Sequence, residues 1–495
     1  MTRLGLDTTI MNPGLYDNTV HRFRDAKIKL PTFRELAYPD EIPNEIQQRL
    51  ADIGPDEAHP LNLFRVHWYN GKDRVSRETV PGHIVLSKEL TGVDAPIVVA
   101  VGERFPMIEA HKVLAAYGCL APRLVTGQFD PTVHRAVWPS TGNYCRGGVA
   151  ISRIMQCRGV AVLPENMSKE RFSWLKRWVL DETDIIKTPG SESNVKEIYD
   201  ECNRLDRDPS NVIFNQFAEF GNHLVHYAVT GRALSHVFEH LRGRHPDWKL
   251  FGFTSATGSA GTIAAGDYLK DTHGSKTIAV EALECPTLLY NGFGEHNIQG
   301  IGDKHVPLIH NVYSSDVCTA ISDANTDSLF LLFNTEVGKR YLTEKKNVAP
   351  HVVDSLPSLG FSGICNVLAA IKTARYYNLS ANDVLVTVAT DNAGMYGTEI
   401  EKILNLRFGG SFDQLDAAYV FGRYLSALTT DHYMEMTTRD KDRVFNLGYF
   451  TWVEQQGVSL HEFEARRRPD FWRGLHRLLA LWDEQIRVFN EKTGA

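Results

Sequence analysis

The sequence predicts an α/β protein built on parallel β-sheets, with additional segments at both ends of the chain. Short apolar runs rich in β-branched residues alternate with helical patterns between residues 95 and 391, and Gly-rich turns separate them. This succession of strand, turn, helix and strand is typical of parallel sheets covered by helices. The length of 495 residues allows roughly two or three domains with a sizeable core.

We expect strands where continuous apolar runs have the length of a buried strand. These runs are 95–101, 159–167, 184–190, 249–258, 276–282 and 383–391. Apolar residues at helical spacing predict one helix over 107–118, ending at Gly118, and another over 168–180.

The two ends of the chain lack this alternation. Residues 1–85 are rich in Pro, Asp, Glu and Arg and have weak periodicity, so we expect an N-terminal extension that wraps around the core. After residue 400 the alternation stops, and residues 468–492 have apolar residues at helical spacing. We therefore expect a core over 86–400 and a mainly helical C-terminal extension over 401–495, which caps the core or mediates dimerisation.

Composition excludes several kinds of partner. The formal net charge of −7 argues against nucleic acid or an anionic membrane, because both attract basic surfaces. No apolar run approaches the ~20 residues that span a bilayer, and the first residues lack the apolar core of a secretory signal. The seven cysteines are scattered, odd in number and never spaced as CxxC, which favours neither a disulfide framework nor a zinc ribbon. Together these features predict a protein of the reducing cytoplasm.

A run of small residues follows one of the predicted strands. Residues 255–270, SATGSAGTIAAGDYLK, lead from the end of that strand into a predicted helix. Backbone amides and the helix dipole at such a turn favour a bound phosphate. The alternative is an ordinary strand–helix turn whose residues are small for packing.

Lys112 lies on an otherwise apolar helix face, in MIEAHKVLAAYG. A buried lysine is costly unless it is neutralised or hydrogen-bonded, and buried lysines serve as Schiff-base nucleophiles. The commoner alternative is a lysine at the edge of the face with its head group in solvent.

The segment WPSTGNYCRGG (138–148) places four small polar residues ahead of an apolar run. A helix N-cap needs only one such residue, so the sequence predicts a loop that grips a ligand. In LGFSGICNVLAAI (359–371), Ser362 also precedes an apolar helix, where an N-cap is the simpler interpretation. The sequence contains no GxSxG elbow, no GxxxxGK[ST] loop and no strand-linked GxGxxG.

The segment HVFEH (236–240) could form a metal site. The segment fits the H-x-x-E-H arrangement of one class of zinc hydrolase, because two histidines at i and i+4 share a helix face. A solvated helix explains the same residues, and nothing downstream specifies an acidic ligand. We therefore predict no metal.

Taken in order, these motifs resemble the fold-type II pyridoxal-phosphate enzymes of the cysteine synthase and cystathionine β-synthase group, over roughly residues 90–400. The Ser-Thr-Gly-Asn loop follows Lys112 at close to the family interval. Four further segments are each similar to a family motif and occur in the family order: RGVAVLPENMSKERFSWL, NQFAEFGNHLVHYAVTG, GEHNIQGIGDKHVP and GFSGICNVLAAI. It is this order that makes the resemblance specific.

The resemblance implies a fold like that of the tryptophan synthase β-subunit. Two three-layer αβα subdomains would enclose pyridoxal 5'-phosphate between them, with the smaller subdomain at about residues 105–225 of the 86–400 core. It also implies a homodimer.

Roles follow from the resemblance, residue by residue. Lys112 would hold the cofactor as an internal aldimine and would then act as the base at the substrate α-carbon, its pKa lowered by desolvation. The implied cofactor-binding residues are Lys112, Asn143, Gly258, Ser259, Ala260, Gly261, Thr262 and Ser362. The implied substrate-binding residues are Ser140, Thr141, Gly142, Asn143, Tyr144 and Gln216.

By the resemblance, each group of residues would bind a different part of the substrate or the cofactor. The loop and Gln216 would bind the substrate carboxylate, and Asn143 would also reach the cofactor's ring hydroxyl. Residues 258–262 would bind the cofactor phosphate. Ser362 would hydrogen-bond the pyridine nitrogen, but it would not keep that nitrogen protonated as a carboxylate would, so the ring would be a weaker electron sink.

A weaker sink favours prompt loss of a β-leaving group. The expected function is thus β-replacement or β-elimination on a small amino acid through an aminoacrylate, as in cysteine synthase. Two alternatives stay open: a dehydratase or threonine-synthase-like lyase acting on a hydroxy or phospho-amino acid, and a non-catalytic relative that keeps the fold. Because Tyr144 and Cys145 depart from the family loop, we expect both to line the substrate side.

Overall fold

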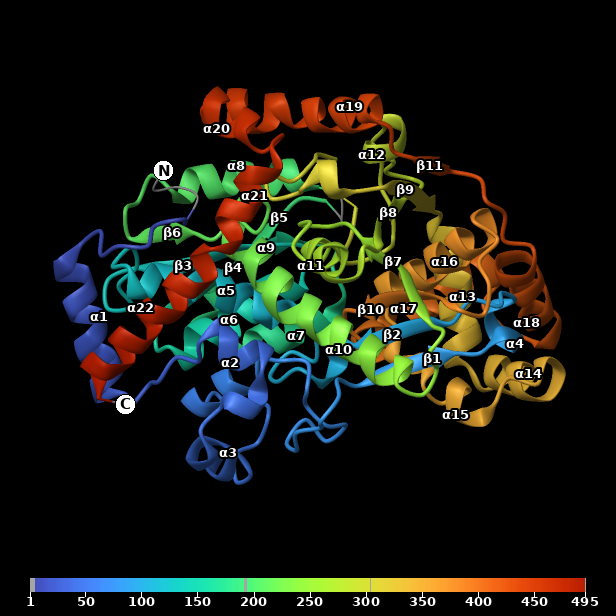
Figure 1. Cartoon of the computed structure of the whole chain (residues 1–495), viewed down its shortest axis with the longest axis horizontal. Coiled ribbons are helices and arrows are strands. Elements are labelled where there is room, and N and C mark those ends of the chain that lie inside the picture. Colours follow the sequence, from blue (N-terminus) through green and yellow to red (C-terminus); the bar gives the residue numbers. More distant parts are fainter. Residues whose placement is uncertain (1–4, 191–193, 303, 495) are drawn as a thin grey trace.

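The computed structural model describes residues 5–190, 194–302 and 304–494, and it contains two β-sheets flanked by helices (Figure 1). Strands and helices alternate from residue 97 to residue 389, which confirms the predicted α/β class. None of the described helices is both long and apolar enough to cross a membrane.

In the described part of the chain, the larger sheet has seven strands in the order β1-β2-β10-β7-β8-β9-β11. Neighbours among β2, β10, β7, β8 and β9 are parallel, whereas β1 and β11 pair antiparallel at the two edges. The strands are β1 (His83–Leu86), β2 (Ile97–Val101), β7 (Lys249–Ala256), β8 (Lys276–Ala282), β9 (Val317–Ile321), β10 (Asp383–Ala389) and β11 (Tyr433–Glu435).

Helices cover both faces of the larger sheet. Successive residues of a strand point to opposite faces, so each face contributes its own residues to a core. Ile97 and Val99 of β2 belong to the core formed with α13 and α16, while Val98 and Ala100 belong to the core that includes α10 and α11. The helices around this sheet are α4 (Lys88–Thr91), α10 (Gly231–Arg242), α11 (Ala264–His273), α12 (Thr287–Tyr290), α13 (Asp323–Asn334), α14 (Glu336–Lys346), α15 (Pro350–Val353) and α16 (Phe361–Tyr376).

The smaller sheet is parallel throughout and has, among the residues described, four strands in the order β5-β4-β3-β6. Val137, Val160 and Val162 pack on α8 at one face, and α6 contacts β3 and β4. The elements are β3 (Arg135–Pro139), β4 (Arg158–Pro164), β5 (Ile185–Thr188), β6 (Asn211–Ile213), α5 (Lys112–Val125), α6 (Asn143–Ile154), α7 (Lys169–Trp178), α8 (Val195–Leu205) and α9 (Phe220–Val225).

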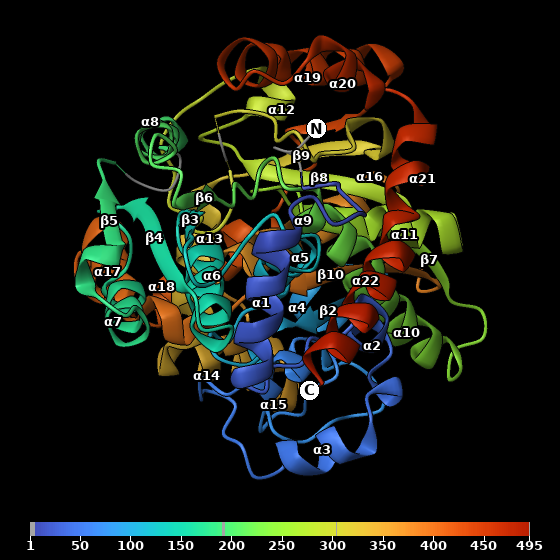
Figure 2. The same cartoon turned by 90° about the vertical axis from the view of Figure 1, so that its left-hand side faces the viewer.

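The segments before β1 and after residue 396 pack on each other as well as on the sheets. The backbone N–H groups of Phe33 and Arg34 donate to the carboxylate of Asp483 at 2.6 and 3.2 Å. The ring of Phe489 packs edge-on against Tyr16 and Phe23. Figure 2 shows α1 and α22 beside each other in front of α5.

The helices of these two segments are α1 (Pro13–Asp25), α2 (Phe33–Ala37), α3 (Asn44–Leu50), α17 (Gly397–Phe408), α18 (Gln414–Phe421), α19 (Thr438–Tyr449), α20 (Leu460–Ala465), α21 (Pro469–His476) and α22 (Leu478–Thr493). The larger sheet also takes strands from outside residues 86–400, because β1 begins at His83 and β11 spans residues 433–435.

The helix predicted over 107–118 is wrong at both ends. It begins only at Lys112, because Met107 and Glu109 have φ values of 66° and 50°, which a helix cannot include. It continues through Gly118 to Val125. At Gly118 the helix lies so close to α9 that a Cβ would stand 2.8 Å from the side chain of Val225. The glycine therefore permits close packing of two helices and does not end one.

Candidate active site

A polar hollow lies between the two sheets, at the carboxyl ends of their parallel strands. Its lining includes Ser140 just after β3, Gly258 just after β7 and Thr390 just after β10. Ligands of parallel α/β sheets bind at this edge. Lys112 lines both halves of the hollow, so sequence segments far apart in the chain converge on it.

Lys112 is the first residue of α5, and its Nζ donates a hydrogen bond to Oγ of Ser259 at 3.2 Å. Asn222 of α9 donates to the same Oγ at 3.0 Å and to the carbonyl of Gln216 at 3.0 Å. The predicted lysine, the predicted small-residue loop and the predicted glutamine are thus joined through one asparagine. Sequence reasoning did not single out Asn222, although it lies in the family-like segment NQFAEFGN.

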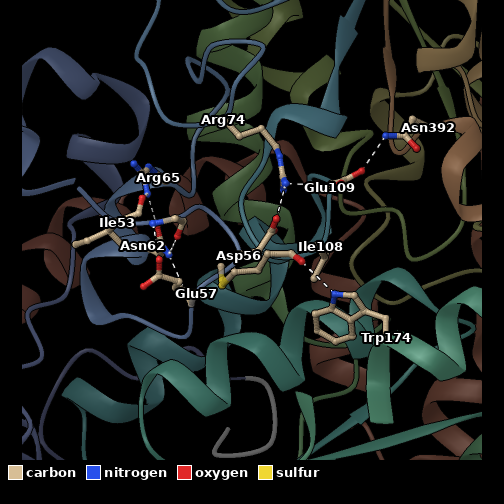
Figure 3. Close-up of polar contacts among 12 residues, drawn as sticks. Ile53, Asp56, Glu57, Asn62, Arg65, Arg74, Ile108, Glu109, Trp174 and Asn392 are labelled. Carbon is tan, nitrogen blue, oxygen red and sulfur yellow. Dashed lines mark hydrogen bonds and ion pairs between the residues drawn. The ribbon is translucent and has the colours of Figure 1, made fainter. Parts of the chain in front are cut away.

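The backbone that leads into Lys112 is held from several sides (Figure 3). Arg146 donates to the carbonyl of Ile108 at 3.0 Å, and the indole of Trp174 donates to the carbonyl of Met107 at 3.1 Å. These bonds hold the segment just before α5, in which Met107 and Glu109 have positive φ values. The segment sets the direction in which α5 begins.

The N-terminal extension takes part in this support. Arg74 forms ion pairs with Asp56 and, at 3.4 Å, with Glu109. Glu109 accepts a hydrogen bond from Asn392 at 3.1 Å, just beyond β10 (Figure 3). The extension therefore helps position the segment that carries Lys112.

The small-residue loop between β7 and α11 offers an anion site. Within the described chain, none of the backbone N–H groups of residues 258–262 donates to an acceptor. Ala260 adopts φ 61°, a left-handed conformation that non-glycine residues rarely take. Unsatisfied amides at the start of a ten-residue helix, with the positive end of its dipole behind them, are suited to a phosphate.

Individual residues of this loop face different surroundings. Gly258 and Ser259 line the hollow beside Lys112, and Ala260 and Thr262 line its other half. Gly261 does not line it. A Cβ there would stand 2.0 Å from Asn222, so this glycine allows the loop to approach α9.

The Ser-Thr-Gly-Asn loop lies on the opposite wall, at the start of α6. Ser140, Thr141 and Asn143 line the hollow. The N–H of Gly142 instead donates to Oγ of Ser140 at 3.1 Å, and Gly142 itself does not line the hollow. Gln216 lines the same half, as the sequence predicts.

Asn143 is already engaged by two neighbours. Its amide donates to the carboxylate of Asp391 at 2.7 Å, and its oxygen accepts from Arg146 at 3.0 Å. Asp391 also accepts from the hydroxyl of Tyr396 at 2.7 Å. Asp391 follows β10, outside every motif that the sequence offered, and it fixes the orientation of the asparagine.

This polar network contains more positive than negative charge. Arg146 and Arg171 are both almost fully buried, and burial, helped by the neighbouring Arg171, lowers the pKa of Arg146 to about 10. Arg171 donates to Gln299 at 2.6 Å and to Tyr396 at 3.2 Å. Two buried guanidinium groups behind the loop favour an anion in front of it.

Of the two residues that depart from the family loop, Tyr144 lies as expected and Cys145 does not. Tyr144 lines the hollow, but its hydroxyl donates to the carbonyl of Phe214 at 3.2 Å. Cys145 does not line it, because its thiol is fully buried against the carbonyl of Gly142. The prediction that Cys145 faces the substrate is wrong. The residue points back into the helix turn, where burial raises the pKa of its thiol to about 12.

Ser362 is the second residue of α16 and lines the half of the hollow that Lys112 shares with Thr262. Ser255, in the same lining, has a buried hydroxyl without a hydrogen-bond partner in the described structure. A Cβ built on Gly300, which also lines the hollow, would meet no atom within 4 Å.

His111, the residue before Lys112, forms an aromatic layer beneath the site. Its ring stacks on Trp68 and lies edge-on to His226 at 5.2 Å between centroids. Its Nε2 lies 3.0 Å from the hydroxyl of Thr262. Burial, assisted by the neighbouring lysine, lowers the pKa of His111 well below its ordinary value, so the imidazole is neutral.

The segment HVFEH does not gather into a metal site. His236 is hydrogen-bonded to the hydroxyl of Tyr69 at 3.0 Å, and Glu239 is paired with Arg242 at 2.6 Å. These contacts account for the segment as part of α10 facing the N-terminal extension.

The residues present fit pyridoxal phosphate. The amine of Lys112 lies beside the loop 258–262, whose five N–H groups donate to no acceptor in the described structure. The loop at the start of α6 has two buried arginines behind it. The hydroxyl-bearing Ser362 lines the other half of the hollow. The open space beside Gly300 and the unpartnered hydroxyl of Ser255 also suit a bound group with polar atoms.

No protein-family model matches the chain. A probable cysteine synthase of Bacillus subtilis is 26% identical over 263 residues, which are 52% of this chain and 75% of that protein. A hydrogen sulfide-producing enzyme of Fusobacterium nucleatum has 19% identity and a TM-score of 0.53, over 67% of this chain and 98% of that one. An O-acetylserine-dependent cystathionine β-synthase of Helicobacter pylori has 20% identity and a TM-score of 0.52, over 64% and 94%.

The chain has the fold of the fold-type II pyridoxal-phosphate enzymes, and its sequence is similar to that of cysteine synthases. The two sheets are its two αβα subdomains, and the hollow with Lys112 lies between them. Members of this family use pyridoxal phosphate.

Proposed function

We propose that the protein is a pyridoxal-phosphate-dependent lyase or transferase that catalyses β-replacement or β-elimination on a small amino acid by the aminoacrylate route. The observation that supports this most is the hydrogen bond of 3.2 Å between Lys112 and Ser259, because Ser259 belongs to the loop whose N–H groups lack acceptors. A covalent anchor thus stands directly beside a phosphate site. The relatives that carry the name cysteine synthase point to the same type of reaction.

Residues 258–262 and Ser362 would hold the phosphate and the ring nitrogen of the cofactor. Bound there, pyridoxal phosphate draws electrons from the substrate α-carbon, so that the α-proton and then the β-substituent can leave. Lys112, first the covalent anchor, then accepts the α-proton on its Nζ, and Ser259 keeps the amine within reach.

The Ser140–Asn143 loop and Gln216 would bind the substrate carboxylate. The start of α6 supplies N–H groups, and the buried Arg146 and Arg171 add positive potential behind them. Asp391 holds the Asn143 amide in place, so that its orientation is set before the substrate arrives.

We also propose that residues 86–400 form the catalytic core, with the smaller subdomain at about 105–225, and that the protein works as a cytoplasmic homodimer. All seven cysteines are free and buried, which suits a reducing compartment. Leu406 on α17 and Leu415 on α18 are 76% and 79% exposed, and they are the surface we assign to the subunit contact. Light scattering of the wild type and of Leu415→Glu tests that assignment.

The function is tested by offering the cofactor-loaded protein O-acetyl-L-serine, L-serine, O-phospho-L-serine and L-cysteine, each with and without sulfide. We expect at least one β-substituted substrate to be consumed, giving either a new β-substituted amino acid or pyruvate and ammonia. Lys112→Ala should abolish the turnover. The proposal fails if none of these is consumed while O-phospho-L-homoserine yields threonine, since that would assign the threonine-synthase-like alternative.

A further inference from the structure

A second group of chemically active side chains lies away from the hollow with Lys112. His223 of α9, Asp267 of α11 and His476 of α21 each offer one ligand atom, and these atoms lie within 4.8 Å of one another. Figures 1 and 2 show α21 beside α9 and α11. The group therefore joins the segment after residue 400 to two helices that flank the proposed cofactor site.

The tautomer of His223 is fixed by the protein. The residue is fully buried, and its Nδ1 lies 3.2 Å from the carbonyl of Ile309. A carbonyl only accepts, so Nδ1 carries the proton and donates, which leaves a lone pair on Nε2. An imidazole oriented in this way by a backbone carbonyl is the usual arrangement of a histidine that binds a metal.

That lone pair faces another acceptor. Nε2 of His223 lies 3.9 Å from Oδ2 of Asp267, and within the described structure Nε2 has no hydrogen-bond partner. The distance exceeds that of an N–H···O hydrogen bond, roughly 2.7–3.2 Å, so a shared proton does not join the two atoms. Two ligands of a tetrahedral zinc ion stand roughly 3.4 Å apart, which is close to the observed spacing.

His476 completes the group. Its Nε2 is buried and also lacks a partner, and its ring lies nearly parallel to that of His223 at 5.9 Å. The ring is stacked on Tyr227, with 3.5 Å between the ring centroids. His476 is the last residue of α21 and is partly buried.

The surroundings suit a cation with one further ligand. Asp267 and His476 line a cavity of about 220 Å³ that also borders Asp271, so water can reach a fourth position. Asp267 is additionally held by Asn311 at 2.7 Å, which fixes the carboxylate. The nearby cations Lys270 and Arg473 are already paired with Asp316 and Asp470.

We propose that His223, Asp267 and His476 bind a divalent transition-metal ion of the zinc type, with water as the fourth ligand, and that this ion fastens α21 to α9 and α11. Two imidazoles, one carboxylate and an open position are a ligand set that such ions prefer. Our sequence-based prediction of no metal weighed HVFEH and the weaker HLVH (223–226), which contains His223. The three ligands are too far apart in the sequence to form a motif.

The test uses the full-length protein, stripped of metal with a chelator and titrated with Zn²⁺ by calorimetry and elemental analysis. We expect about one zinc ion per chain. Asp267→Asn and His476→Ala should each weaken binding at least roughly 100-fold, because each removes one ligand. His240→Ala, a histidine on the neighbouring α10 outside the group, should bind zinc like the wild type.

Two further measurements keep the test decisive if a variant folds poorly. Cobalt(II) added to the metal-free wild type should give the visible absorption of a tetrahedral site. Zinc should also raise the melting temperature of the wild type and of His240→Ala, but not that of Asp267→Asn. The proposal is overturned if the wild type takes up no stoichiometric zinc, or if both ligand variants bind it as tightly as the wild type does.

Discussion

Nζ of Lys112 lies 3.2 Å from Oγ of Ser259, and Asn222 donates to that same oxygen. The proposed anchor, the proposed phosphate loop and helix α9 therefore meet at one hydroxyl group. Because each of the three comes from a different part of the chain, the site exists only once both subdomains are assembled.

The first prediction concerns Lys112→Ala. We expect the variant to lose covalently bound pyridoxal phosphate and all β-replacement or β-elimination activity. Its stability should change by only about 0.5 kcal/mol, because the lysine is partly exposed at a helix start and alanine suits a helix. Borohydride reduction followed by mass spectrometry measures the attachment. A variant that retains the reduced adduct on another lysine would show that Lys112 is not the anchor.

The second prediction concerns Asp391. Replacement by alanine leaves the Asn143 amide and the Tyr396 hydroxyl buried without this acceptor, and it removes a negative charge that interacts favourably with Arg146. We expect a loss of about 3 kcal/mol in the free energy of unfolding.

Asp391→Asn is the matched control, because it keeps one acceptor oxygen in place. We expect it to lose about 1–2 kcal/mol. Urea unfolding followed by fluorescence and by circular dichroism gives both values. Equal losses in the two variants would contradict the role assigned to the acceptor.

The third prediction compares two glycines in helices. A Cβ on Gly148 of α6 would stand 2.0 Å from the indole of Trp138, whereas a Cβ on Gly474 of α21 would meet no atom within 4 Å. Gly148→Ala should destabilise the protein by at least about 2 kcal/mol through overpacking. Gly474→Ala should stabilise it by roughly 0.5–1 kcal/mol through helix propensity.

Thermal unfolding of these two variants beside the wild type checks the comparison. The melting temperature should fall for Gly148→Ala and rise slightly for Gly474→Ala. If both variants shift in the same direction, the close contact between α6 and Trp138 is not the cause.

The fourth prediction concerns pH. Glu281 at the end of β8 is buried, and burial raises its pKa to about 8 from 4.5, although the N–H groups of Leu288 and Leu289 donate to it. Between these two pKa values the folded state holds a proton that the unfolded state releases. The contribution of this group to stability is therefore greatest at low pH and falls as the pH rises toward 8, by up to about 1.4 kcal/mol per pH unit.

Glu281→Gln removes this titration while keeping a similar shape. The free energy of unfolding of the variant, relative to the wild type, should rise between pH 5.5 and pH 8. Urea unfolding at several pH values measures the difference. A relative stability that stays constant over this range, or that falls, would mean that the carboxyl group ionises normally when buried.

Much of the architecture is predictable because the parallel strands are buried on both faces. Continuous apolar runs such as 276–282 and 383–391 then stand out from their surroundings and match β8 and β10 closely. The edge strands β1 and β11 escaped prediction. Both are short: β11 has three residues and none of them is buried, and of the four residues of β1 only Leu86 is buried.

Some residues of the candidate site could be predicted from the sequence, and others could not. Residues that sit in a motif, such as Lys112 and Ser140, are found from their order along the chain, and the fold brings them to one hollow. Asp391 and Asn222 support those residues through single hydrogen bonds. A lone Asp after a strand or a lone Asn in a helix has many structural explanations, so only the three-dimensional contact reveals such a role.

Helix α22 has a consequence for synthesis of the protein. Its residues Trp482, Ile486 and Phe489 belong to the same core as α5, and it is the last helix that the structure describes. On the ribosome, the faces of Phe33 and Tyr16 that pack on Trp482 and Phe489 lack these partners until α22 has been synthesised. The N-terminal segment can therefore complete its packing only after residues 478–493 have left the ribosome.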